Sequence, residues 1–132
     1  MDRTKQIGGF STNPPCLVLY APESIHNMGC SIAIGVTDSD GTFCILVDDL
    51  FFRFRKPEQY AIIYHEICHI LYHPQGCERN MNYELQADAF SKAITKDNSL
   101  MAALELTKRF ATNHSVIDEL NLRIASLEQI EV

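Results

Sequence analysis

Short apolar runs separated by turn residues mark the first part of the chain. The runs at 16–20, 31–36 and 42–48 are rich in valine, isoleucine and leucine and are flanked by turn-forming residues, a pattern typical of strands. The Asp-Gly pair between the second and third runs favours a tight reversal, so these two runs predict a β-hairpin. Residues 1–15, with Gly-Gly and Pro-Pro pairs, are predicted to be a flexible tail or entry loop. Residues 49–56 carry aromatic and basic side chains and fit either a strand or a loop.

Helical periodicity dominates the remainder of the chain. Four helices are predicted, at 57–73, 82–96, 99–111 and 115–128. Pro57 suits a first helical turn, Pro74 ends the first helix, and Asn82 is the predicted cap of the second. The predicted fold class is therefore α+β, with a small N-terminal antiparallel or mixed sheet followed by an active-site helix, a ligand helix and two C-terminal helices.

Composition and charge limit the classes of function. A chain of 132 residues can bury a core without disulfides, so we expect a single domain over 1–132. No apolar stretch approaches the roughly 18 residues of a membrane span, and a net charge of −6 without a basic cluster disfavours direct binding to nucleic acid. The five cysteines include no C-x-x-C pair, and the first residues do not resemble a secretory signal. These observations predict a cytoplasmic protein.

The stretch YHEICHILYHP places two histidines four residues apart in the first predicted helix. With a rise of about 1.5 Å and a turn of about 100° per residue, His65 and His69 lie on one face and can reach one metal ion. Glu66 lies beside this pair, where a general base for a metal-bound water is expected. The alternative is that all three are incidental polar residues of an apolar helix, but their burial without a common partner would be costly.

A catalytic zinc usually needs a third protein ligand. His73 lies about 12 Å beyond His65 along the helix axis and is expected to end the helix instead. The metzincin pattern fails, because the glycine and third histidine that it requires are absent. Glu84, in the stretch ELQAD, can face the histidine pair if the second helix returns antiparallel, and Asp88 can then accept a hydrogen bond from a ligand imidazole. Alternatively, both acids form a solvated helix edge near an N-terminus.

HEICH followed by ELQAD resembles the gluzincin zinc metallopeptidases, and looks most like the small ImmA/IrrE-like peptidases and the minimal single-domain gluzincins. The matched part covers roughly residues 43–94. The resemblance implies one Zn²⁺ per chain with His65, His69 and Glu84 as ligands, Glu66 as the base and Asp88 as the partner of a ligand histidine. It also implies a substrate that lies extended along a sheet edge.

Some gluzincins place a histidine and an arginine after the ligand helix. On that resemblance His114 and Arg123 are candidates for stabilising an oxyanion, and the alternative is a loop histidine and an exposed helical arginine. Three tyrosines are competing donors of the same kind, each also explained as a packed aromatic: Tyr64, Tyr72 and Tyr83.

The sequence thus predicts a zinc metalloendopeptidase that hydrolyses peptide bonds in a protein or peptide substrate, with Glu66 as the general base. A second hypothesis is a non-catalytic metal-binding domain that regulates or contacts another protein of a mobile element or stress-response system. A third is a purely structural helix whose histidines are satisfied by protein partners. Metal content separates the third hypothesis from the others, and replacement of Glu66 separates the first two.

Overall fold

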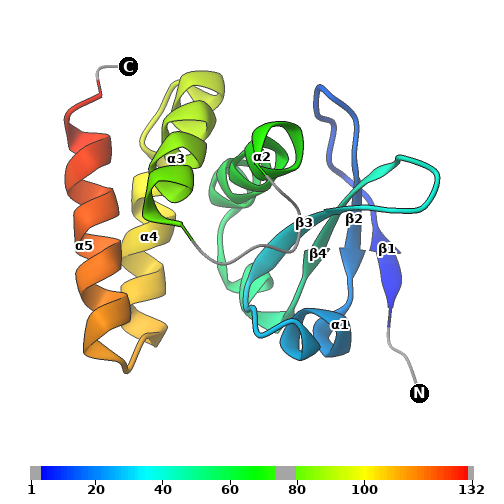
Figure 1. Cartoon of the computed structure of the whole chain (residues 1–132), viewed down its shortest axis with the longest axis horizontal. Helices are drawn as coiled ribbons and strands as arrows, with labels where there is room; N and C mark the ends of the chain where they lie inside the picture. The colour runs from blue at the N-terminus through cyan, green and yellow to red at the C-terminus, as the bar shows by residue number, and fades with distance from the viewer. Residues whose placement is uncertain (1–3, 74–79, 131–132) are drawn as a thin grey trace.

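A four-stranded mixed sheet forms one layer of the fold (Figure 1). The computed structural model describes residues 4–73 and 80–130. The strands are β1 (Lys5–Ile7), β2 (Leu17–Tyr20), β3 (Ala33–Thr37) and β4 (Phe43–Val47), in the order β1-β2-β4-β3. β2 and β4 are parallel, whereas β1 pairs antiparallel with β2 and β3 pairs antiparallel with β4. The hairpin expected around the Asp-Gly pair is therefore present, and β3 lies at an edge of the sheet.

The helices follow the predicted order, with two short additions. They are α1 (Pro22–Asn27), the 3₁₀ helix η1 (Asp49–Arg53), α2 (Lys56–Tyr72), α3 (Met81–Thr95), α4 (Ser99–Phe110) and α5 (His114–Glu128). The predicted α+β class is confirmed. η1 stands where a strand or loop was expected, because the Asp48 carboxylate caps it by accepting a hydrogen bond from the Leu50 N–H at 2.9 Å. Within the described residues, every helix is too short or too polar to cross a bilayer.

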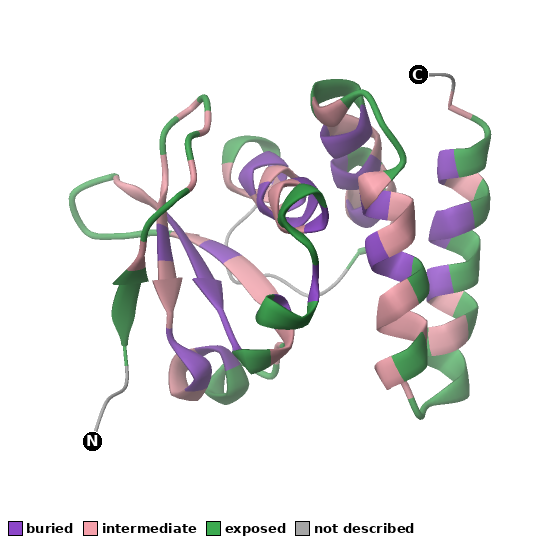
Figure 2. Cartoon of the chain, turned by 180° about the vertical axis from the view of Figure 1, so that it is seen from behind, coloured by how far each residue is buried: buried purple, intermediate pink, exposed green. Residues whose placement is uncertain are grey.

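α2 lies between the sheet and the other long helices (Figure 1). On one side, Ile63 and Ile67 belong to a buried cluster with Ile45 of β4. On the other side, Ala61 belongs to a second buried cluster with Leu120 of α5. Figure 2 shows the buried residues on the faces that α2, α3, α4 and α5 turn toward one another. Because α2 is covered on both sides, polar side chains within it need partners from neighbouring elements.

The N-terminal segment is part of the fold and differs from the predicted flexible tail. β1 pairs with β2 at the edge of the sheet opposite β3. The Phe10 ring lies 6.1 Å from the Phe51 ring and 5.3 Å from the Tyr60 ring, measured between centroids, and the Lys56 Nζ lies 3.7 Å from the Phe10 centroid. These contacts join Phe10, which follows β1, to η1 and α2.

The cap of α3 lies two residues before the predicted position, and α5 also begins at an asparagine cap. Asn80 caps α3 by accepting hydrogen bonds from the N–H groups of Asn82 and Tyr83, so the prediction of Asn82 as the cap is wrong. Asn113 similarly caps α5 by accepting from the Ser115 N–H at 2.8 Å. The earlier start of α3 places Glu84 at the end of the first helical turn.

Candidate metal centre

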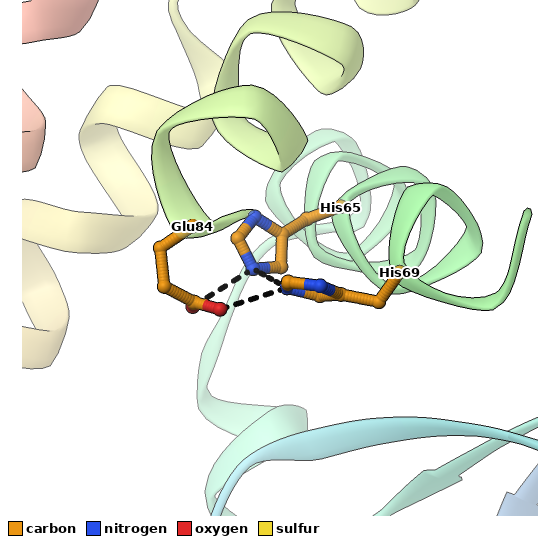
Figure 3. Close-up of side chains that lie close together, drawn as sticks. All are labelled: His65, His69 and Glu84. Atoms are coloured by element: carbon orange, nitrogen blue, oxygen red, sulfur yellow. Dashed lines mark hydrogen bonds and ion pairs between the residues drawn. The ribbon is translucent and has the colours of Figure 1, made fainter. Parts of the chain in front are cut away.

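His65 and His69 of α2 and Glu84 of α3 bring three potential metal-ligating side chains together (Figure 3). The Nε2 atoms of the two histidines lie 3.2 Å apart. Glu84 places Oε1 at 3.3 Å from the His65 Nε2 and Oε2 at 2.9 Å from the His69 Nε2. In a tetrahedral zinc site, bonds of about 2.0–2.1 Å set neighbouring donor atoms about 3.3 Å apart. The donor types are those of zinc sites, and one ligand atom from each of the three residues lies within 4.8 Å of the other two. The separations of 2.9–3.3 Å also match hydrogen bonds among the same groups.

Local structure accounts for this convergence. The four-residue spacing of His65 and His69 puts both rings on the side of α2 that faces α3. Asn80 caps α3, and one helical turn later Glu84 faces the histidine pair. The close packing of α2 and α3 leaves Glu84 only 9% exposed, which rules out the solvated helix edge as its environment.

Asp88 and Arg123 hold the far side of the His65 ring. The Nδ1 of His65 lies 2.8 Å from the Asp88 Oδ1, the contact expected of the partner of a ligand histidine. Arg123 donates to the same carboxylate through Nε (2.8 Å to Oδ2) and Nη2 (2.7 Å to Oδ1). Arg123 is only 6% exposed, so the alternative of an exposed helical charge is wrong. Its guanidinium engages Asp88 behind the ligands, and its Nη1 lies 3.9 Å from the Glu84 Oε1.

The charges around His65 favour a cation at this point. Burial alone would lower the pKa of His65, but hydrogen bonds to Asp88 and Glu84 outweigh burial and raise that pKa to about 9. Burial likewise opposes ionisation of the two acids, yet hydrogen bonds from His65 and His69 lower the pKa of Glu84, and those from Arg123 and His65 lower the pKa of Asp88. Two ionised carboxylates in a buried site suit either a protonated imidazole or a metal ion.

Glu66 points toward the sheet rather than into the ligand cluster. Its Oε1 accepts a hydrogen bond from the Gly35 N–H of β3 at 3.1 Å, and its Oε2 lies 3.7 Å from the His65 Nε2. Burial raises the pKa of Glu66, although the nearby His65 and His69 act in the opposite direction. The carboxylate thus stands beside the ligands with its proton affinity increased, as a general base requires.

Gly35 allows β3 to approach α2 this closely. A Cβ atom at Gly35 would lie 2.8 Å from the backbone oxygen of Glu66 and 2.9 Å from Cγ1 of Ile70, both too close for any other residue type without movement of the strand. The glycine therefore places its N–H within reach of the Glu66 carboxylate.

A cavity of about 550 Å³ opens beside the candidate ligands. One wall is β3 together with the segment before it, residues 28–35. α4 and α5 contribute an apolar part of the lining, Leu100, Ala103, Leu104, Val116 and Leu120, together with the polar Thr107, Glu119 and Arg123. His65, Glu66, His69 and Glu84 line the same cavity, so a molecule bound there would reach the candidate metal centre.

Some of the candidate oxyanion donors predicted from the sequence lie at the cavity, and others lie away from it. His114 is exposed at the start of α5 and is not among the residues that line the cavity. Tyr64 stacks on Tyr60, and Tyr72 is 68% exposed. Tyr83 lines the cavity and stacks on His73 with ring centroids 4.2 Å apart. Of the candidate oxyanion donors, Arg123 and Tyr83 are thus the ones that the structure places at the cavity.

Comparisons with protein-family models, with curated proteins and with solved structures give no match for this chain. The resemblance of HEICH and ELQAD to the gluzincins therefore stays a prediction, and any assignment of function rests on the residues of the site and their geometry.

Proposed function

We propose that the chain is a zinc-dependent peptidase with His65, His69 and Glu84 as zinc ligands and Glu66 as the general base. The observation that carries the proposal is the set of separations of 2.9–3.3 Å among two imidazole nitrogens and a carboxylate, with a second carboxylate alongside. Two imidazoles and one carboxylate favour zinc among the common divalent ions. Three protein ligands also leave a fourth position for a reactant, as catalytic zinc sites do.

When bound, zinc would polarise a peptide carbonyl and lower the pKa of an attacking water. Glu66 would accept the proton of that water and then deliver it to the nitrogen of the departing amine. The Gly35 N–H keeps the Glu66 carboxylate on the cavity side of α2. Asp88, itself held by Arg123, would keep Nδ1 of His65 protonated and direct its Nε2 to the metal. Arg123 therefore acts in this proposal through Asp88.

β3 supplies a place for an extended peptide substrate. The strand lies at the sheet edge, and its Gly35 N–H reaches the Glu66 carboxylate rather than β4. Because backbone groups alternate in direction along a strand, those of Ala33 and Thr37 also face away from β4. The Ala33 N–H already donates to the Ser31 oxygen at 2.9 Å, so an added peptide would pair with the remaining outward groups of these residues. A peptide added beside β3 would run along the cavity past Glu66, and its side chains would meet the apolar part of the lining from α4 and α5. We therefore propose a protein or peptide substrate with an apolar side chain next to the cleaved bond.

We further propose a cytoplasmic location. The support is chemical: Cys16, Cys44 and Cys68 are free thiols in the described part of the chain, as in proteins kept in a reducing compartment.

The test is metal-dependent proteolysis by the purified full chain. We expect cleavage of an unfolded protein substrate such as casein, detected by mass spectrometry, to stop after dialysis against a chelator and to return on addition of zinc but not magnesium, because magnesium prefers oxygen ligands. The cleavage sites should be enriched in apolar residues on one side of the bond. Cleavage that persists unchanged in the chelator would contradict the proposal.

A further inference from the structure

His73 lies in contact with His69 on the side away from the other candidate ligands. The two Nδ1 atoms are 2.8 Å apart, a hydrogen-bond distance, while the Nε2 of His69 faces Glu84 and His65. The Nε2 of His73 in turn lies 2.8 Å from Oε1 of Gln86 on α3. A continuous chain of hydrogen bonds thus runs from His69 through His73 to Gln86, two residues beyond Glu84.

Only one arrangement of protons satisfies this series of hydrogen bonds when the Nε2 of His69 binds a metal. A neutral His69 must then carry its proton on Nδ1 and donate it to His73. His73 must accept through an unprotonated Nδ1, so its own proton resides on Nε2. That proton is donated to the Gln86 oxygen, which closes the chain without an unpaired donor or a net charge.

The His73 ring is fixed in the position that this role requires. It is only 8% exposed, and it stacks on the Tyr83 ring at an interplanar angle of 16°. His73 follows the last residue of α2 and caps that helix, with its backbone N–H bonded to the His69 oxygen at 3.0 Å. Contacts from both α2 and α3 therefore hold the ring edge against His69.

The two histidines would be oriented by chemically different partners. His65 contacts a carboxylate that is paired with an arginine, whereas His69 contacts the imidazole of His73, which in turn contacts an amide oxygen. A ligand histidine ordinarily donates its second N–H to a carboxylate, a backbone carbonyl or water, so an imidazole acceptor for His69 is a less usual choice. Loss of such a partner typically weakens metal binding about 10–100-fold.

We infer that His73 is a positioning residue of the candidate metal centre, which accepts the Nδ1 proton of His69 and thereby directs the His69 Nε2 to the metal. The inference rests on the proposed zinc site. It gives the third histidine of HEICHILYH a role other than that of a ligand, and it makes Gln86 the end point that sets the tautomer of His73.

Variants at position 73 separate this role from simple packing. His73→Phe keeps a ring to stack on Tyr83 but removes the acceptor, so we expect zinc affinity to fall about 10–100-fold in competition with a chromophoric chelator. His73→Asn loses the stacked ring but retains an acceptor oxygen as many bonds from the backbone as Nδ1, so we expect it to bind zinc more tightly than His73→Phe. Gln86→Met should weaken binding by a smaller factor. Circular dichroism of the metal-free variants controls for folding.

The unmodified protein provides a test that does not depend on the folding of any variant. Long-range ¹⁵N–¹H spectra of the zinc-loaded chain should show His73 protonated at Nε2 and bare at Nδ1, and His69 protonated at Nδ1. A proton on Nδ1 of His73, or equal zinc affinity of wild type and His73→Phe, would overturn the inference while leaving the zinc site in place. Failure of the wild type to bind zinc would overturn both this inference and the proposed function.

Discussion

Replacement of Glu66 by glutamine is expected to leave zinc bound and to lower the rate of peptide hydrolysis by about 10²–10⁴-fold. Glutamine has nearly the same shape and retains an oxygen that can accept the hydrogen bond of the Gly35 N–H, but it cannot take a proton from water. The rate with casein or a fluorogenic peptide and the zinc content should be measured on the same preparation, so that loss of turnover is distinguished from loss of metal.

Glu105→Gln is the matched control for Glu66→Gln. Glu105 lies on α4 in an exposed pair with Lys108, and it is not among the residues that line the cavity. The control variant should hydrolyse substrate at the wild-type rate. A Glu66→Gln protein with wild-type turnover would refute Glu66 as the base. A wild-type protein that binds zinc and a peptide, with no hydrolysis and no dependence on Glu66, would favour the non-catalytic metal-binding domain.

Among the substitutions proposed for this chain, Arg123→Ala should cause the largest decrease in the free energy of unfolding. Asp88 is 1% exposed. Of the two partners described above, His65 and Arg123, the variant would leave the buried Asp88 carboxylate with His65 alone. Loss of one member of a buried ion pair typically costs about 3–5 kcal/mol, so we expect the free energy of unfolding to fall by about that amount. Urea denaturation of the metal-free protein, monitored by circular dichroism, would measure the change.

The exposed pair on α4 gives the comparison for Arg123→Ala. Lys108→Ala removes a cation from a pair whose side chains are 30% and 56% exposed, and such pairs contribute about 0–1 kcal/mol. The difference between the two variants isolates the effect of burial. If Arg123→Ala were as mild as Lys108→Ala, the hydrogen bonds from Arg123 to Asp88 would not be important for the stability of the site.

Most of the regular secondary structure could be predicted from the sequence. The apolar runs at 16–20, 31–36 and 42–48 and the helical periodicity from 57 onward carry strong local signals, and the structure has strands and helices there. β1 was missed, since its three residues KQI offer no alternation and depend on pairing with β2. α1 was missed because six residues are too few to show a helical period.

The core of the candidate site could also be predicted, since the spacing of His65, Glu66 and His69 is fixed within one helix. The partners from other elements were harder to find, because they depend on how helices pack. Two signals were nevertheless available. Arg123 occupies a position in the same helical period as Leu120, Ile124 and Leu127, which indicates a buried face. The second signal is Gly35, because a glycine inside a predicted strand often marks a close approach of another backbone.

His73 could not be assigned its partner from the sequence. Its distance from His65 along the axis excludes it as a common ligand, but the contact of its Nδ1 with His69 depends on the extended backbone that ends α2. Lys92 shows the same dependence on packing: it is buried, and its Nζ donates to the backbone oxygens of Leu127 and Ile130 at the end of α5.

The metal content of the purified chain tests the central claim most directly. Elemental analysis of the untagged wild type should find about one zinc per chain, and Glu84→Ala, which removes the carboxylate that faces both ligand histidines, should retain much less. A wild type without zinc even after zinc is supplied, or a Glu84→Ala protein with the wild-type ratio, would contradict the assignment of His65, His69 and Glu84 as a metal centre.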